Sequence, residues 1–142
     1  MKKILSIACI ALVVAALASC KKTYVTNVAA NQTWISRPLV TSDWAQTRDG
    51  KADSVDIPVQ VKYDFYNDID ATLTYFSFVP NVWEQVPEVF NGISYSYIHY
   101  IDDSGKLHVV LYSQPVNGGT PVKPVDPITL KLVLIPSEVI NN

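Results

Sequence analysis

Two histidines stand close to one turn and could act together. His99 and His108 lie on either side of Asp102-Asp103-Ser104-Gly105, a sequence typical of a tight turn between paired strands. Two imidazoles can begin a metal site or supply a general base, and a third ligand would have to come from Asp102 or Asp103. The alternative, which we favour, is that each histidine is an ordinary surface or half-buried residue of a sheet.

Acidic residues gather in two connections. One connection contains Asp64, Asn67, Asp68 and Asp70, and the other contains Asp49, Asp53 and Asp56 around Gly50. Oxygen ligands at short spacing can bind Ca²⁺, but the first connection lacks the spacing, the central glycine and the final glutamate of an EF-hand loop. We therefore expect solvated turns in both places and no metal site.

A third arrangement of acids is the pair Glu84 and Glu88 on either side of Pro87. Paired carboxylates hydrolyse glycosides only when they are held at a defined separation, and an irregular stretch containing proline does not define one. The chain also has no G-x-S-x-G element and no glycine-rich phosphate loop. We predict no catalytic residue and no cofactor, so a hydrolase is a distant third hypothesis.

Aromatic residues are the most informative candidates for binding. Exposed aromatic rings on a flat sheet stack against sugar rings or partner proteins, although a small domain also needs aromatic residues in its core. Trp34 and the tyrosines of residues 93–101 belong to the same set. Core packing is the favoured interpretation for any one of them, and the candidates for ligand contact are Trp44, Trp83 and Tyr100.

The N-terminus has the order of a secretion signal. Lys2 and Lys3 precede the fifteen apolar or small residues 4–18, which is shorter than the roughly twenty residues needed to span a bilayer. The segment ends in Leu17-Ala18-Ser19-Cys20, which resembles the lipobox of bacterial lipoproteins. The resemblance implies that the signal peptidase recognises Leu17, Ala18 and Ser19 and cuts before Cys20. It also implies that diacylglycerol is attached to the Cys20 thiol and that the new amine is acylated.

This lipidation would make the membrane the first partner of the protein. Each buried CH₂ group contributes about 0.8 kcal/mol, and two or three acyl chains on Cys20 would make detachment negligible. The chain then divides into a signal peptide (1–19), a lipidated cysteine with a short tether (20–32), and one domain (33–142). Cys9 is lost with the signal peptide, so the domain has neither a disulfide nor a thiolate metal site.

The charge of the chain argues against a nucleic-acid partner. Eleven Lys and Arg face thirteen Asp and Glu, a net charge of −2, which becomes −4 when Lys2 and Lys3 are removed. The remaining basic residues are scattered, whereas a nucleic-acid surface requires a basic patch.

The domain has the sequence pattern of an all-β protein. Alternation with period two predicts strands over residues 71–79, 93–101, 106–112 and 128–135, and weaker strands over 33–40 and 53–61. Residues 62–67 could form one helical turn, and residues 93–112 should form a hairpin in which Tyr95 and Tyr97 face the core. About seven short strands with frequent turns predict an antiparallel β-sandwich. A long connection over residues 114–127, with four prolines, is either functional or only flexible.

Several segments carry a resemblance to a known group of proteins. They are Ser42-Asp43-Trp44, Thr72-Leu73-Thr74-Tyr75, Trp83-Glu84-Gln85-Val86-Pro87, Ile93-Ser94-Tyr95-Ser96-Tyr97 and Leu130-Lys131-Leu132-Val133-Leu134-Ile135. The chain resembles small Bacteroidetes lipoproteins whose C-terminal domain also occurs after collagen-like repeats, although it has no Gly-X-Y repeat itself. The resemblance implies a β-sandwich at the outer membrane and no known activity. Lys21-Lys22-Thr23, in place of an acidic export signal after the cysteine, favours the periplasmic face over the cell surface.

Two functions remain open at this point. The first is a lipid-anchored, non-enzymatic interaction or structural module of the cell envelope. The alternative is a glycan-binding accessory protein that uses exposed aromatic residues or the 114–127 connection. Burial of Trp44 and Trp83 would favour the first function, and an exposed coplanar pair would favour the second.

Overall fold

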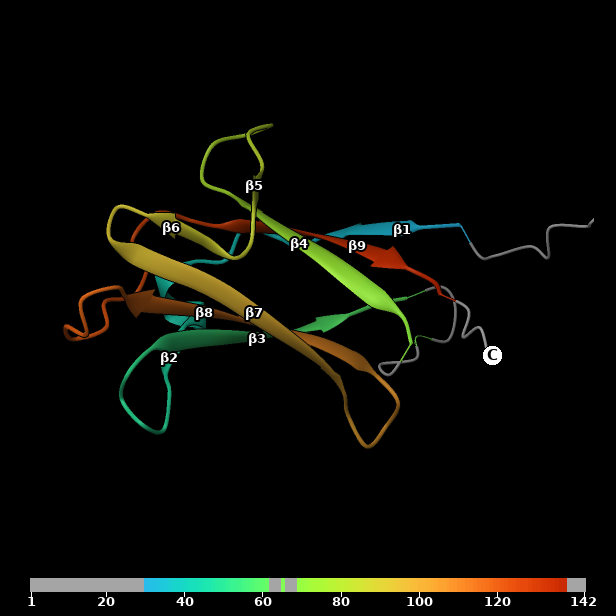
Figure 1. Cartoon of the computed structure of the whole chain (residues 1–142), viewed down its shortest axis with the longest axis horizontal. Coiled ribbons are helices and arrows are strands. Elements are labelled where there is room, and N and C mark those ends of the chain that lie inside the picture. The colour runs from blue at the N-terminus through green and yellow to red at the C-terminus, as the bar shows by residue number, and fades with distance from the viewer. Residues whose placement is uncertain (1–29, 62–64, 66–68, 138–142) are drawn as a thin grey trace, which may run out of the picture.

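The computed structural model describes residues 30–61, 65 and 69–137. Figure 1 shows two layers of antiparallel strands packed face to face. The prediction of an all-β antiparallel sandwich is confirmed. Leu17, Ala18, Ser19 and Cys20 lie outside the described residues, as does nearly all of the predicted helical turn at 62–67. Within the described ranges, no helix has the length and apolar character required to cross a membrane.

The first sheet has four strands in the order β1-β9-β4-β5. Their bounds are Gln32–Ile35 for β1, Thr129–Ile135 for β9, Ala71–Ser77 for β4 and Glu84–Gln85 for β5. Gln32 pairs with Leu134 and Ala71 pairs with Ile135, so the chain enters β1 at the end of the sandwich where β9 leaves it. The turn between β6 and β7 lies at the opposite end (Figure 1).

The second sheet has five strands in the order β2-β3-β8-β7-β6. Their bounds are Ala45–Gln46 for β2, Asp53–Val59 for β3, Leu107–Pro115 for β8, Ile93–Ile101 for β7 and Glu88–Phe90 for β6. A single 3₁₀ turn, η1 (Thr41–Asp43), precedes β2. The predicted hairpin is confirmed as β7 and β8, although β8 runs three residues further than expected. The Asp102 carboxylate accepts the backbone N–H groups of Ser104 and Lys106, both at 2.9 Å, which closes the turn.

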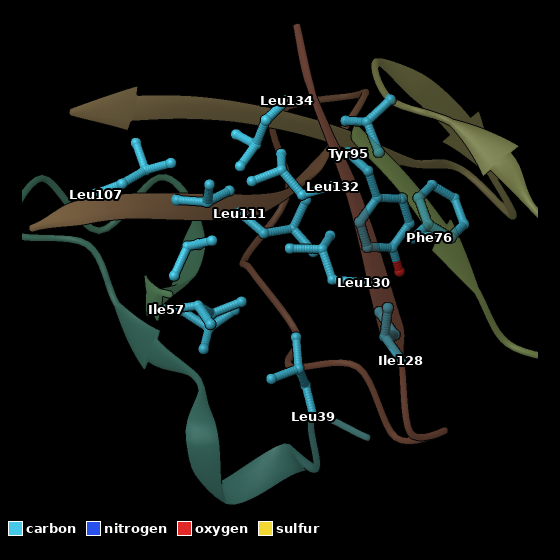
Figure 2. Close-up of a cluster of buried hydrophobic side chains, with 14 of the residues drawn as sticks. Leu39, Ile57, Phe76, Tyr95, Leu107, Leu111, Ile128, Leu130, Leu132 and Leu134 are labelled. Atoms are coloured by element: carbon cyan, nitrogen blue, oxygen red, sulfur yellow. The ribbon is translucent and has the colours of Figure 1, made fainter. Parts of the chain in front are cut away.

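The core lies between the sheets and follows from the alternation of apolar residues. Leu130, Leu132 and Leu134 of β9 are fully buried, and they face Leu111 of β8 across the interface. Figure 2 shows these side chains pointing toward one another together with residues of β3, β4 and β7. The predicted core position of Tyr95 is confirmed, since its ring lies 5.0 Å from that of Phe76. The core is therefore built by the inward residues of both sheets.

Several predicted strands end earlier than the alternation suggested. The strand expected over 33–40 stops at Ile35, because Pro38 has no N–H to donate and restricts the residue before it. The chain returns to the sheet only at Leu39, which forms an isolated bridge with Ile128. The residues between Ile35 and Leu39 therefore form a short loop, which places Arg37 outside the sheet.

Candidate functional site

A cleft of about 380 Å³ opens at the side of the sandwich, between the edge of one sheet and the edge of the other. One wall comes from β1 and the segment that follows it, and the other comes from β3. The residues that line this lateral cleft are Trp34, Ser36, Arg37, Leu39, Asp43, Val55, Asp56, Ile57 and Pro58. Its volume falls in the range of about 300–1,000 Å³ that is usual for small-molecule sites.

An ion pair forms the polar rim of the lateral cleft. The two terminal nitrogens of Arg37 lie 2.7 Å from the two carboxylate oxygens of Asp43, one to each. The same carboxylate accepts the backbone N–H of Val40 at 2.8 Å. The arrangement is a bidentate fork, which fixes the planes of both groups. The Arg37 side chain is 64% exposed, whereas that of Asp43 is only 19% exposed.

Both members of this pair are charged at neutral pH. The hydrogen bonds from Arg37, together with that from Val40, lower the pKa of Asp43 to about 2. The hydrogen bond to the Asp43 carboxylate, in turn, raises the pKa of Arg37 above its ordinary value. An exposed pair of this kind contributes little to stability. Its two hydrogen bonds instead hold charged groups in a defined position at the rim of the lateral cleft.

The remaining walls are apolar side chains and strand backbone. Trp34 is half-buried and packs at the margin of the core, while Leu39 and Ile57 belong to the buried floor. β2 pairs only with Asp53 and Ser54, so the rest of β3 has an uncovered edge on this side. In this register Asp56 and Pro58 direct their backbone groups toward that edge. Pro58 has no N–H, which blunts the edge against pairing with another strand.

Asp56 also belongs to a polar cluster on the outer face of the second sheet. Its carboxylate lies 2.8 Å from Nδ1 of His108 and accepts the Tyr100 hydroxyl at 2.7 Å. Nε2 of His108 lies 3.2 Å from Asp102, and the rings of Tyr100 and His108 stack at 5.0 Å. Both ring nitrogens of His108 therefore face carboxylates of neighbouring side chains.

The structure does not bring the two histidines together. β7 and β8 pair Tyr100 with His108 and His99 with Val109, so the two imidazoles point to opposite faces of the sheet. His99 faces inward, against Phe65 and 3.1 Å from the Thr72 hydroxyl, and burial lowers its pKa. A shared metal site or base of His99 and His108 is therefore excluded, as the favoured alternative predicted.

Trp44, one of the three candidate ligand-contact aromatics, is buried. Its side chain is 1% exposed and belongs to the hydrophobic core. The reason is local: η1 turns the chain directly before Trp44, so the indole enters the space between the sheets. Trp44 cannot offer a ring face to a ligand in this structure.

Trp83 and Tyr100 keep accessible positions, but each ring already has a partner. The Lys131 ammonium lies 4.5 Å from the Trp83 ring and 4.4 Å from the Tyr75 ring, on the outer face of the first sheet. Tyr100 lies on the outer face of the other sheet, in the polar cluster with His108. The three predicted ligand-contact aromatics therefore lie in three different places.

The structure describes only part of the predicted acidic clusters. Asp64, Asn67 and Asp68 lie outside the described residues, and the buried Asp70 accepts the backbone N–H of Ser137 at 2.9 Å. Asp49 caps its own turn through Thr47 and Lys51, and the hydrogen bonds lower its pKa. Asp53 is buried at the start of β3, whereas Asp56 faces outward. Among the residues that the structure describes, no group of three His, Cys, Asp or Glu could hold a metal ion.

Glu84 and Glu88 belong to different sheets. Glu84 is in β5 of the first sheet, and Glu88 is in β6 of the second. The spacing of four residues in the sequence therefore does not predict the distance between the two carboxylates.

The sequence pointed to Trp34 and Asp56 of the lateral cleft but not to Arg37 or to the cleft itself, although one signal was present. Trp34, Arg37 and Asp43 stand within ten residues and surround Pro38, and a proline at that point predicts that the strand ends and the chain turns outward. The proximity of β3 could not be foreseen, since it depends on how the two sheets pack.

Comparison with protein-family models, with curated proteins and with solved structures finds no match for this chain. The resemblance to small Bacteroidetes lipoproteins therefore stays a prediction.

Proposed function

We propose that this protein is a lipid-anchored, non-enzymatic binding module of the outer membrane, and that its ligand site is the lateral cleft. The observation that carries the proposal is the fixed fork of Arg37 and Asp43 beside a half-buried Trp34, over an apolar floor. A concave site with a few fixed polar groups over apolar walls is the usual form of a small-molecule site.

The anchor is argued from the sequence. Leu17-Ala18-Ser19-Cys20 supports cleavage before Cys20 and its lipidation. Only fourteen residue steps separate Cys20 from Trp34, which is at most about 50 Å of fully extended chain. An acyl anchor on Cys20 would therefore hold the cleft within that distance of the membrane. Lys21 and Lys22, which follow the cysteine, favour the periplasmic face, and protease shaving of intact cells tests this choice.

A binding role fits the arrangement of titratable groups better than an enzymatic one. The two oxygens of Asp43 are engaged by Arg37 and Val40, and the Asp56 carboxylate is engaged by His108 and Tyr100. Among the described residues, neither acid is hydrogen-bonded to a second carboxylate or to a serine or threonine hydroxyl. A general acid or base must lie within hydrogen-bond reach of the proton it transfers, and these groups are held by their own partners.

An array that carries both saccharides and extended peptides tests the proposed site. The full-length protein, purified in detergent, should bind part of the array, and Arg37→Ala should abolish that binding. Lys131→Gln is the matched control, because it removes an exposed cation from a different face. If Arg37→Ala binds like the wild type while Lys131→Gln does not, the ligand site lies on the outer face of the first sheet and the proposal is wrong.

A further inference from the structure

We infer that the lateral cleft recognises an uncharged sugar ring of a glycan. This inference rests on the proposed function and names the ligand class of the same site. It is carried by the juxtaposition of two features in one cleft: an indole and a bidentate ion pair.

The first feature matches the apolar face of a sugar. A pyranose ring has C–H groups on its faces, and an aromatic ring presents a flat, electron-rich surface to them. Trp34 lines the lateral cleft and is only half-buried. β1 is the edge strand of its sheet. The ring of Trp34 can therefore form one wall of the cleft while the rest of its surface packs on the core.

The second feature matches the hydroxyl groups. A sugar hydroxyl both donates and accepts a hydrogen bond, and adjacent hydroxyls on a ring present two such groups side by side. In the fork, the remaining N–H groups of Arg37 can donate to a hydroxyl, and Oδ1 of Asp43, which accepts one hydrogen bond from Arg37, can accept another. Its geometry is fixed before binding, which reduces the entropy lost when a ligand is ordered.

The charge of the lateral cleft favours a neutral ligand. The fork presents one positive and one negative charge side by side, and Asp56 adds a second carboxylate to the lining. An anionic ligand would have to approach two carboxylates, and the full chain is itself negative, with a net charge of −2. A cationic ligand would instead meet Arg37, whose side chain is the more exposed member of the pair.

A sugar is favoured over an extended peptide for two reasons. A peptide that added to β3 would need a row of free backbone donors, and Pro58 interrupts that row. The cavity of about 380 Å³ lies near the lower end of the range for small ligands, about 300–1,000 Å³. It therefore suits a compact ring better than a strand with side chains.

The other aromatic surface is a weaker candidate for this role. Trp83 and Tyr75 already enclose the Lys131 ammonium, at 4.5 and 4.4 Å from the ring centroids. A cation over a ring is itself a favourable contact, so a sugar would have to displace it. Trp34 has no such occupant among the described residues.

Isothermal titration of the full-length protein in detergent tests the inference. The probes are three neutral trisaccharides (of glucose, mannose and N-acetylglucosamine), a triglucuronate as the anionic probe, and an uncharged extended hexapeptide. We expect at least one neutral trisaccharide to bind and Arg37→Ala to weaken its binding by at least about tenfold, because a hydrogen bond to a charged group is lost. Trp34→Leu, which keeps apolar packing, should weaken it as well, and Trp83→Phe should leave it unchanged.

The outcomes separate the inference from the proposed function. If the hexapeptide binds with a dependence on Arg37 and the trisaccharides do not, the lateral cleft is a binding site but the sugar inference is wrong. If triglucuronate binds more tightly than every neutral probe, the ligand is anionic and the inference is also wrong. If no probe binds in a manner that depends on Arg37 or Trp34, both the inference and the proposed site are overturned.

Discussion

The hydroxyl of Tyr97 on β7 donates a 2.9 Å hydrogen bond to the backbone carbonyl of Thr72 on β4, so a side chain of one sheet caps an edge of the other. β5 pairs only with Tyr75 and Phe76 of β4. Within the part of the chain that the structure describes, no strand on that side reaches Thr72, so the contact satisfies its carbonyl. Exposed strand edges are prone to pair with other chains, and proteins blunt them in ways such as this.

Removal of that hydroxyl should destabilise the sandwich. We expect Tyr97→Phe to lower the free energy of unfolding by about 1–2 kcal/mol, since a partly buried carbonyl loses its partner. Tyr100→Phe is the matched control on the same strand, because its hydroxyl bonds Asp56 at the surface. Urea unfolding followed by tryptophan fluorescence measures both, and equal losses would contradict the capping role of Tyr97.

Two threonines on the inner face of β4 should respond in opposite directions. Thr74 is fully buried, and its hydroxyl has no hydrogen-bond partner within the part of the chain that the structure describes. Thr74→Val should therefore raise the free energy of unfolding by about 1 kcal/mol, because the cost of burying an unpaired hydroxyl disappears. The measurement is the urea midpoint at constant slope.

Thr72→Val is the control for that substitution. The Thr72 hydroxyl lies 3.1 Å from Nδ1 of His99, so its replacement should lower the free energy of unfolding by about 1 kcal/mol. A loss of stability in both variants would show that the Thr74 hydroxyl has a partner after all.

Asp102 should make the protein sensitive to acid. Hydrogen bonds from the Ser104 side chain and the Lys106 backbone are the largest causes that lower its pKa to about 2. Because this pKa lies below that of the unfolded chain, the contribution to stability is complete above about pH 4 and is lost as the pH falls toward 2. Asp102→Asn should therefore flatten the decrease in stability over this interval.

Ser104→Ala tests the cause of that shift. It removes the largest contribution, so the pKa of Asp102, followed by the NMR signal of its carboxyl carbon, should rise from about 2 toward 3.8. An unchanged titration would mean that the Lys106 N–H and the other partners hold the carboxylate without the serine.

Cys20→Ala tests the anchor. If diacylglycerol is attached to Cys20, the variant should lose labelling by palmitate and move from the membrane to the soluble fraction, because its acyl chains are absent. Cys9→Ala is the matched control and should remain labelled and bound. A Cys20→Ala protein that is still labelled by palmitate would contradict the proposed lipid anchor at Cys20.

The sequence predicts the buried strands well and the short ones poorly. Leu130, Leu132 and Leu134 alternate strictly, and a period of two places them all on one face. β2, β5 and β6 have only two or three residues each, too few for any period to be visible. These short strands form because longer neighbours provide an edge beside them.

The histidines show where spacing alone is insufficient. His99 and His108 stand on opposite arms of a correctly predicted hairpin, yet the register pairs His99 with Val109. A shift of one residue in register exchanges the two faces of a strand. The number of residues in the turn therefore decides whether two side chains share a face. The alternation of apolar residues along the strands does not predict this number.

Trp44 and the lateral cleft depend on tertiary packing in different ways. The direction of the Trp44 indole is set by η1, a turn of three residues without periodicity. The cleft needs β1 and β3, which belong to different sheets, and their proximity follows from the packing of the whole core. Local sequence could indicate the outward turn at Pro38 but not the wall opposite it.

The most direct test of the central claim, that the lateral cleft is the ligand site, is the indole N–H region of an NMR spectrum. The chain has three tryptophans: one in the cleft, one in the core and one beside Lys131. Titration of the full-length protein in detergent with the tightest-binding neutral trisaccharide should shift the Trp34 signal and leave those of Trp44 and Trp83 in place. A titration that shifts Trp83 while the Trp34 signal stays fixed would contradict the account.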